Sequence, residues 1–354
     1  MEFTSLFQTY GGMTRPAYTL KVGGQALAAG DDVRLLRAVC ELTCRQKAGY
    51  LQLEAVLDPE GETGSAWLEA LQLGAACSFS LGYGSSKTTV FCGFLYDISW
   101  SDPLSQGPLG IEAVFLDVRG RLMASSRADA GSARTWSQML HAILGQSCCT
   151  QLASSTTVQN VPEDWDLPAL RTGLTDYEVV CHAAEYLCYE FSAWADELYF
   201  GPPRSVSSPA VTFRGPTGLT ELRRRRTLAG QCGAVTVSGA DDAGTPISAR
   251  QARSRDSGFG AGGMSAVLSN DLQQAEPAIH TMAQAQYLAQ ARMKARQHQA
   301  GGVSGRCLGV PELRPGRFLE IAELSGAVNG TYYIHTVRHT LDVSGYETCF
   351  EAEE

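Results

Sequence analysis

Apolar residues alternate with polar or small residues over long stretches of the first third of the chain, and this pattern restricts the fold more than any other feature. A period of two is that of a β-strand with one buried face. The longest run keeps one apolar face over eleven positions and comprises Val90, Cys92, Phe94, Tyr96, Ile98 and Trp100. Residues 51–57, 75–83 and 111–118 also predict strands. The pattern predicts antiparallel strands that close into a barrel or a strongly curled sheet.

A second set of strand signals lies near the C-terminus, in residues 311–350. Asn329-Gly330 predicts a tight type I′ turn, because both central positions of that turn need a positive φ. Ser344-Gly345 predicts another turn. Around these turns we expect strands at residues 317–324, 331–341 and 346–350.

Three segments between these regions have helical signals. Residues 133–146 predict a helix with an apolar stripe formed by Trp136, Met139, Leu140, Ile143 and Leu144. Thr175 and Glu178 have the spacing of a capping box, which predicts the start of a second helix. Residues 276–299, rich in Ala and Gln, predict a long helix with Pro277 in its first turn. Residues 250–263 predict a loop, and short strands are expected at residues 191–195, 197–200, 211–213, 219–228 and 234–238.

Composition and charge disfavour several classes of protein. The chain has 354 residues, which is enough for two or three domains. Its formal charge of −9 disfavours a general nucleic-acid binder. No window approaches the roughly 20 apolar residues that span a bilayer, and the first residues lack the basic start of a signal peptide. The eleven cysteines are odd in number and several lie in apolar runs, which favours buried free thiols in a reducing compartment.

No motif in the sequence predicts catalysis, a metal site or a cofactor. The nucleophile-elbow, P-loop, zincin and dinucleotide-binding patterns are missing from a suitable context. His335 and His339 lie in a strand-like segment, where a rise of about 3.3 Å per residue separates them by roughly 13 Å, too far for one ion. The cysteines lack the spacing of a zinc site. We therefore expect no catalytic, metal-binding or cofactor-binding residues.

Arg223, Arg224, Arg225 and Arg226 form the strongest run of charge. On a strand, Arg223 and Arg225 point to one side, whereas Arg224 and Arg226 point to the other. Neither pair can be deeply buried without partners. The run predicts an exposed strand that pairs with carboxylates of the same or a neighbouring subunit. A sharper hypothesis is that one pair lines a channel or a subunit interface.

Three further segments, taken together, resemble a known family. The first joins the strand that ends at residues 94–100 to residues 111–118 and 135–144. The second runs from Thr175-Asp176-Tyr177-Glu178 to Leu198-Tyr199-Phe200-Gly201, and the third extends from residues 309–316 to residues 332–339. Their order and spacing resemble the late control protein D family of contractile-tailed phages and the hub half of VgrG spike proteins. The resemblance covers most of the chain.

The resemblance implies a baseplate hub with a structural role and no enzymatic activity. It implies an α+β, β-rich fold in which each chain supplies two tube-like β-barrel domains, smaller α/β parts and an inserted long helix. Three chains would form a ring that adapts a sixfold tail tube to a threefold spike. The expected parts are residues 1–120 as the first tube-like domain, 121–195 as an α/β connection, 196–240 with 303–354 as the second tube-like domain, and 241–302 as a loop and long helix insertion.

The resemblance also implies the partners of the homotrimer. These are a tail tube protein above, a spike protein below, other baseplate proteins, and a tape measure protein or cargo in the channel. VgrG proteins continue into an OB fold and a β-helical needle, whereas this sequence stops at Glu354, so the spike is expected to be a separate chain. We expect synthesis in the bacterial cytoplasm and incorporation into the baseplate of a phage tail or phage-like particle, without nucleic-acid recognition or stable membrane insertion.

Two other functions stay open at this point. A tail-associated cell-wall hydrolase would use a carboxylate pair that no motif reveals, and muralytic activity of the pure chain would support it. A free-standing β-sandwich adhesin would be a binding module, for which a secretion signal is expected.

Overall fold

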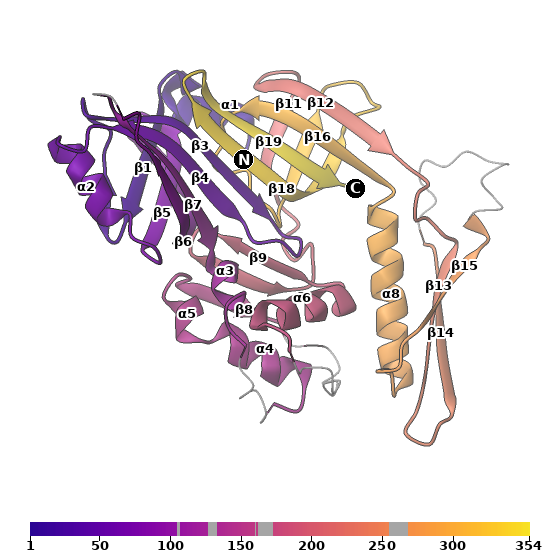
Figure 1. Cartoon of the computed structure of the whole chain (residues 1–354). Coiled ribbons are helices and arrows are strands. Elements are labelled where there is room, and N and C mark those ends of the chain that lie inside the picture. Colours follow the sequence, from indigo (N-terminus) through magenta and orange to yellow (C-terminus); the bar gives the residue numbers. More distant parts are fainter. Residues whose placement is uncertain (105–106, 127–132, 160, 162–172, 255–267) are drawn as a thin grey trace.

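The body of the protein is a 13-stranded sheet (Figure 1). The computed structural model describes residues 1–104, 107–126, 133–159, 161, 173–254 and 268–354. The first half of the sheet contains β1 (Pro16–Val22), β2 (Gln25–Leu27), β3 (Val33–Thr43), β4 (Tyr50–Leu57), β5 (Ala76–Tyr83), β6 (Ser86–Ser101) and β7 (Leu109–Asp117). The second half contains β11 (Pro209–Arg214), β12 (Leu219–Arg226), β16 (Gly301–Leu308), β17 (Phe318–Ala322), β18 (Gly330–Asp342) and β19 (Gly345–Glu353).

The two halves form one continuous sheet. The strand order is β12-β16-β19-β18-β3-β4-β7-β6-β5-β1-β2, and β17 connects β11 to β18. The halves meet where β3 pairs with β18 in antiparallel register, from Arg37 opposite Asp342 to Thr43 opposite Thr336. Strand signals from the two ends of the sequence therefore belong to one sheet. The predicted β-rich α+β fold is confirmed.

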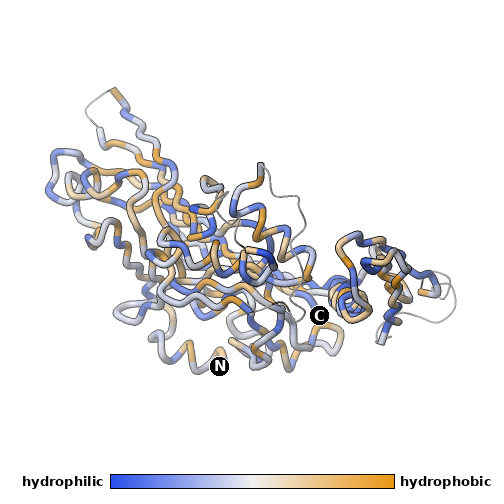
Figure 2. Tube along the Cα trace, turned by 90° about the horizontal axis from the view of Figure 1, so that it is seen from below, coloured by the Kyte–Doolittle hydropathy of each residue, from blue (hydrophilic) through white to orange (hydrophobic). Residues whose placement is uncertain are grey.

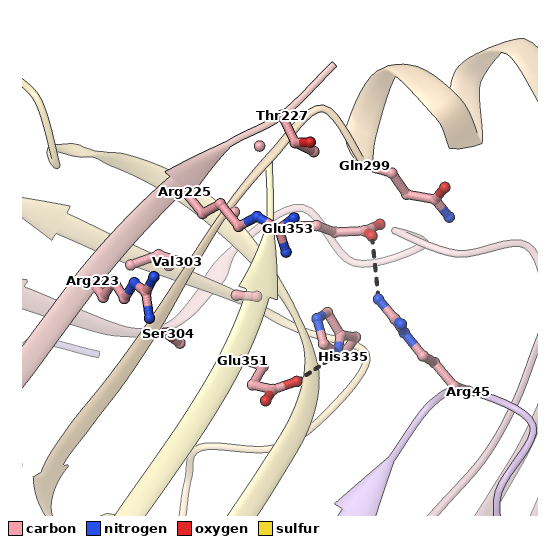
Figure 3. A pocket seen from close by; sticks show the side chains of 13 residues that line it. Arg45, Arg223, Arg225, Thr227, Gln299, Val303, Ser304, His335, Glu351 and Glu353 are labelled. Atoms are coloured by element: carbon pink, nitrogen blue, oxygen red, sulfur yellow. Dashed lines mark ion pairs between the residues drawn. The ribbon is translucent and has the colours of Figure 1, made fainter. Parts of the chain in front are cut away.

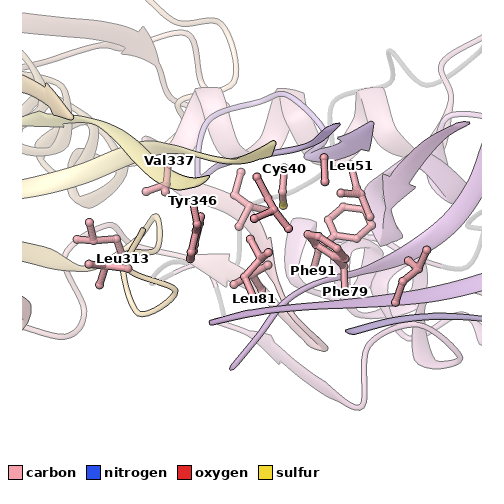
Figure 4. Close-up of a cluster of buried hydrophobic side chains, with 14 of the residues drawn as sticks. Cys40, Leu51, Phe79, Leu81, Phe91, Leu313, Val337 and Tyr346 are labelled. Atoms are coloured by element: carbon pink, nitrogen blue, oxygen red, sulfur yellow. The ribbon is translucent and has the colours of Figure 1, made fainter. Parts of the chain in front are cut away.

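One buried core extends through both halves. Figure 4 shows part of it, with Phe79 and Phe91 contributed by the first half and Leu313 and Val337 by the second. Tyr346 belongs to the same cluster. Because removal of apolar surface from water is the main favourable term in folding, this shared core stabilises the two halves as a unit.

β6 departs from the predicted pattern. Its register shifts opposite β5, between Phe79 and Ser80, and again opposite β7, between Leu95 and Asp97. As a result Phe91 and Leu95 are buried in the core, whereas Tyr96 is 59% exposed and Trp100 is 54% exposed. The prediction of one apolar face over eleven positions is wrong, because β-bulges change which residues face the core.

A smaller α/β part packs below the first half of the sheet (Figure 1). Its buried side chains belong to a second cluster, which also extends to Val235, Ile247 and Leu288 and includes the predicted stripe Trp136, Met139, Leu140, Ile143 and Leu144. The predicted capping box of Thr175 and Glu178 is confirmed at the start of α6. The elements are α3 (Val118–Leu122), α4 (Trp136–Leu144), α5 (Ser147–Thr150), β8 (Ser155–Val158), α6 (Asp176–Leu187), β9 (Glu190–Trp194) and β10 (Glu197–Gly201). Near the main sheet lie α1 (Phe3–Thr9), η1 (Gly11–Met13) and α2 (Glu62–Ala70).

A third part projects from the second half of the sheet, as Figures 1 and 2 both show. Its strands β13 (Ala234–Ala240) and β14 (Pro246–Ala252) pack against α8 (Met282–His298), and β15 (Asp271–Ala275) pairs with β13. Residues 234–240, which we assigned to the second tube-like domain, pair with β14 and β15 in this part. The long helix begins at Met282 with a capping box of Thr281 and Gln284, so Pro277 precedes it. Of the predicted loop at residues 250–263, residues 255–263 lie outside the described residues.

The connection between β17 and β18 is longer than the sequence predicts. Asn329 is not part of a two-residue turn. Its side-chain oxygen accepts a hydrogen bond from the backbone N–H of Leu324 at 3.0 Å, and its amide nitrogen donates to the Leu324 carbonyl at 3.1 Å. The predicted type I′ turn is wrong because the asparagine closes a wider loop through its side chain. Within the described residues, the protein has no helix of the length and apolarity needed to cross a membrane.

Candidate functional site

The arginine run lies on an edge strand. β12 pairs with β16 on one side, from Leu219 opposite Cys307 to Arg226 opposite Gly301. In the part of the chain that the structure describes, no strand pairs with its other side. The backbone groups on that side are available to another chain, as on any uncovered sheet edge. The predicted strand geometry of the arginines is confirmed.

Arg224 and Arg226 both contact the carboxylate of Glu354. Arg224 donates a short hydrogen bond to it, and the Arg226 Nε lies 3.4 Å from the Glu354 Oε1. Arg224 also donates to the Ala327 carbonyl at 2.5 Å, and its guanidinium lies 5.8 Å from the ring centre of Tyr332. Burial raises the pKa of Glu354, but the hydrogen bonds and charges of the two arginines outweigh this effect and hold that pKa below its usual value. This pair has partners within the same chain.

Arg223 and Arg225 point the other way, into a surface groove of about 430 Å³ (Figure 3). Both are exposed, and neither forms an ion pair within the described residues. Arg45 enters the groove from the opposite side, where its guanidinium lies 3.9 Å from the carboxylate of Glu353. The groove therefore contains two arginines that have no carboxylate partner within the described chain.

Two acidic side chains also line this groove. The Glu353 carboxylate faces Arg45 and also accepts a hydrogen bond from Arg204 at 3.2 Å. The Glu351 carboxylate lies 4.0 Å from the Nδ1 of His335. Burial, assisted by the charge of Arg45, lowers the pKa of His335 to about 4, so this imidazole is neutral at pH 7. Three arginines (Arg45, Arg223 and Arg225) and two carboxylates therefore line the groove, so its positive charge is only partly balanced.

The same face of the sheet is acidic near β6. Beyond Leu95, β6 pairs with β7 alone among the residues that the structure describes, so no described strand pairs with its other edge along residues 96–101. Asp97 on β6 and Glu112 on β7 are exposed on the face that also carries Arg223 and Arg225, and they form no ion pair within the described residues. One face of one sheet thus has unpaired arginines at one uncovered edge and unpaired carboxylates near another.

A buried ion pair lies where the halves of the sheet meet the α/β part. Asp117 and Arg119 are 1% and 0% exposed, and the Arg119 Nη2 lies 2.6 Å from the Asp117 Oδ2. The Nη1 of Arg119 donates to the carbonyls of Thr43 at 3.1 Å and Phe191 at 2.7 Å. One guanidinium therefore joins β3, the end of β7 and β9. No local pattern in the sequence predicts it, because the Thr43 and Phe191 carbonyls that Arg119 binds are backbone groups far away in the chain.

Glu190 is a second ionisable group at this junction, and it is partly buried. Its Oε2 accepts a hydrogen bond from the Tyr333 hydroxyl at 2.6 Å, which connects β9 to β18. Burial raises the pKa of Glu190 to about 7, although hydrogen bonds from Tyr333 and Cys44 lower it in part. Sequence reasoning did not single out this residue, since nothing local marks the glutamate as buried.

The two histidines of β18 lie in different environments. A bulge between Ile334 and Thr336 directs His335 into the groove. His339 is fully buried, where its Nδ1 lies 3.0 Å from the Thr348 hydroxyl and 2.9 Å from the Tyr346 hydroxyl. Within the described residues, no group of three or more His, Cys, Asp or Glu side chains is placed to hold a metal ion.

Comparison with known proteins is informative at the level of structure. No protein-family model and no curated protein matches the sequence. A tail protein from Neisseria meningitidis superposes with a TM-score of 0.70 at 12% identity, and the match covers 96% of this chain and 97% of the other. The 43 kDa tail protein of prophage MuSo2 from Shewanella oneidensis gives 0.68 at 15% identity, covering 95% of this chain and 98% of the other.

The chain has the fold of phage tail proteins. The same fold extends to a type VI secretion component of E. coli, described as structurally similar to the bacteriophage T4 tail proteins gp27 and gp5. That match has a TM-score of 0.59 at 12% identity and covers 94% of this chain and 76% of the other. The resemblance drawn from the sequence is confirmed for the tail-protein fold. At these identities the likeness describes the architecture.

Proposed function

We propose that the protein is the baseplate hub of a phage or phage-like contractile injection system, and that three copies form a ring between tail tube and spike. The observation that carries the proposal is the pair Arg223 and Arg225, which is exposed and unpaired on an uncovered edge strand of the tail-protein fold. The proposed role is assembly, and no chemistry is assigned to the protein. Other baseplate proteins would surround the ring, and a tape measure protein or cargo would occupy its channel.

The two uncovered edges support a ring of subunits rather than an isolated dimer. A ring needs a heterologous interface, in which different patches of each subunit meet. The β12 edge with Arg223 and Arg225 and the β6 edge with Asp97 and Glu112 are different patches of opposite charge. When they meet, opposite charges steer the contact and disfavour β12 against a second β12. Each subunit would supply one patch to each neighbour, which closes a ring.

The continuous sheet supports the proposed channel. If the edges of neighbouring subunits meet, the polar face that carries all four charged residues continues from one subunit to the next. We propose that this face lines the channel. Residues 1–120 would supply one tube-like unit, and the strands within residues 209–226 and 301–354 would supply the other.

Charge reversal tests the proposal directly. The double variant R223E/R225E is expected to abolish the trimer and the particle, because it places glutamates opposite Asp97 and Glu112. Sedimentation of the purified chain together with tube and spike proteins, followed by electron microscopy, would measure this. A matched control is R15E/R34E, which makes the same change of charge at two exposed arginines that have no ion pair within the described residues.

A compensating variant separates charge complementarity from loss of folding. Combining R223E/R225E with D97K/E112K restores opposite charges at every subunit contact of a ring, so assembly is expected to return. If R223E/R225E assembles like the unmodified chain, the proposed interface is wrong. If no mixture of the unmodified chain with tube and spike proteins yields particles that contain it, the hub function itself is wrong.

A further inference from the structure

Three large apolar side chains near the uncovered edge of β6 are exposed to solvent. Trp100 is 54% exposed, Tyr96 is 59% exposed, and Leu104, just beyond the end of the strand, is 95% exposed. A single exposed apolar residue is normal, whereas several on one part of a surface mark a contact with another molecule. The charges near this edge have a role in the proposed ring, but these apolar side chains do not yet have one.

Trp100 lies on the core side of the sheet, at its margin. It is opposite Ile111 of β7, which is buried in the core cluster that both halves share. Ile98, two positions earlier, packs against the same cluster. Because successive residues of a strand alternate between its faces, Asp97 lies on the opposite side, here called the outer face. The uncovered edge of β6 is therefore two-sided, with a carboxylate on the outer face and an indole on the core side.

The uncovered edge of β12 has the matching arrangement. Leu222 is only partly buried and packs against the shared core cluster. Arg224 lies on the same core side, opposite the buried Val303 of β16. Arg223 and Arg225 alternate with these residues and point into the groove on the outer face (Figure 3). This edge therefore presents arginines on the outer face and a leucine on the core side.

A second copy of the chain can bring these two edges together. Within one chain the six strands β16, β19, β18, β3, β4 and β7 lie between β12 and β6. Neighbouring strands are about 4.8 Å apart, so the two edges are separated by roughly 34 Å along the sheet. When β12 of a second copy lies beside β6 with the outer faces aligned, its arginines adjoin Asp97 and its Leu222 adjoins Trp100. The reverse alignment would place arginines against the indole and Leu222 against the carboxylate, so both faces match in one orientation.

We propose, on the basis of the proposed hub function, that Trp100 is the apolar anchor of the subunit contact and packs on Leu222 of a second copy of this chain. The backbone of residues 96–101 then pairs with the backbone of residues 219–226 of that copy. Tryptophan is enriched among the few residues that supply most of the affinity of an interface, whereas charges on its rim mainly steer the encounter. The arginines and carboxylates therefore select the neighbouring edge, and the indole holds it.

Photo-cross-linking at position 100 identifies what covers this edge. The photoreactive amino acid p-benzoylphenylalanine replaces Trp100 in the full chain, which is assembled with tube and spike proteins, illuminated, digested with trypsin and analysed by mass spectrometry. A mixture of ¹⁵N-labelled and unlabelled chains distinguishes a cross-link between two copies from one within a copy. The expected product joins position 100 of one copy to the tryptic peptide of residues 215–223 of another, which contains Leu222.

Two variants at the same position measure the contribution of the indole. W100S is expected to raise the protein concentration needed for ring assembly about tenfold or more, as loss of an aromatic anchor does. W100F keeps an aromatic ring and is expected to lose less. The control V343A shortens an apolar side chain that is 78% exposed in the turn between β18 and β19, and it is expected to assemble normally. The unfolding transition of isolated W100S is expected to stay unchanged, because more than half of Trp100 is already exposed.

Two results would overturn the anchor and leave the hub function standing. One is a W100S chain that forms rings at the same concentration as the unmodified chain. The other is an assembled ring in which position 100 cross-links to the tube or spike protein, to its own chain, or to nothing, instead of to residues 215–223 of a second copy. If the unmodified chain forms no ring in any mixture with tube and spike proteins, the hub function is wrong and the anchor is wrong with it.

Discussion

Arg119 and the pair Arg223 and Arg225 show two opposite uses of the same side chain. Arg119 is fully buried and bonds to Asp117 and to backbone carbonyls of two separate strands. Arg223 and Arg225 are exposed on an edge strand and have no ion pair within the described residues. A buried cation needs every partner inside the fold, because desolvation of an unpaired charge is costly. An exposed cation needs none, so it stays available to another molecule.

Removal of Arg119 is expected to have the largest effect. R119M leaves the Asp117 carboxylate buried with backbone donors alone, and breaking a buried ion pair in this way costs about 3–5 kcal/mol. Denaturant unfolding would measure the loss. The double variant D117L/R119M removes both charges and is expected to be less destabilised than R119M. If R119M is as stable as the double variant, or more stable, then the buried Asp117 carboxylate does not depend on Arg119 for its stability.

Glu190 tests the same junction through pH. Burial raises its pKa from 4.5 to about 7, so the unfolded chain releases this proton at lower pH than the folded protein. The contribution of Glu190 to stability is therefore full below about pH 4.5 and is lost as pH rises through 7. E190Q is expected to be more stable than the unmodified chain at pH 8, by at most about 3 kcal/mol.

The advantage of E190Q is expected to vanish near pH 4, where Glu190 is neutral in both states. Urea unfolding at the two pH values measures the difference, and E60Q is a control at an exposed glutamate. A difference that does not depend on pH would show that Glu190 does not titrate in this window.

Arg224 lies on the same strand as Arg223 and Arg225 but has partners within the chain. Its removal is therefore expected to destabilise the protein less than removal of Arg119 and more than removal of Arg223 and Arg225. R224A removes contacts with Glu354, Ala327 and the ring of Tyr332. The expected loss in the free energy of unfolding is about 1 kcal/mol, because Arg226 still faces Glu354. Thermal unfolding would measure it, and a loss as large as that of R119M would mean that the edge strand is part of the folding core.

The smallest effect on folding is expected for R223A/R225A. Surface substitutions without partners usually change stability by less than about 0.5 kcal/mol. The same variant is expected to weaken ring assembly, so it should keep its folding stability while it loses the ability to assemble. Parallel unfolding and sedimentation experiments on one preparation would show this. A clear loss of stability in the isolated chain would argue that these arginines serve the fold of their own subunit.

The sequence predicts elements better than it predicts their surroundings. The stripe of α4, the capping box of α6 and the strand that carries the arginine run follow from local spacing. The pairing of β3 with β18 does not, because it joins residues 37–43 to residues 336–342. The turn at Asn329 was also missed, since its geometry depends on a side chain that bonds back to Leu324.

The candidate site shows the same division. Alternation along a strand sufficed to predict that Arg223 and Arg225 share one side. It could not show that this side faces an open groove or that the Glu354 carboxylate contacts both arginines of the other pair. The pocket lined by Trp194, Glu312 and Arg317 has no local signal at all, because these residues come together only when the loop before β17 packs against β9.

By itself, the sequence determined the β-rich character of the protein, its main helices and the two-sided arrangement of its arginines. Those properties depend on residues within a few positions of one another, where backbone geometry fixes which side chains share a face. The tertiary structure alone decided that two distant strand regions form one sheet, that bulges turn Tyr96 and His335 outward, and that Arg119 is enclosed while Arg223 and Arg225 are not. These outcomes depend on which distant surfaces exclude water from each other, and spacing along the chain does not record that.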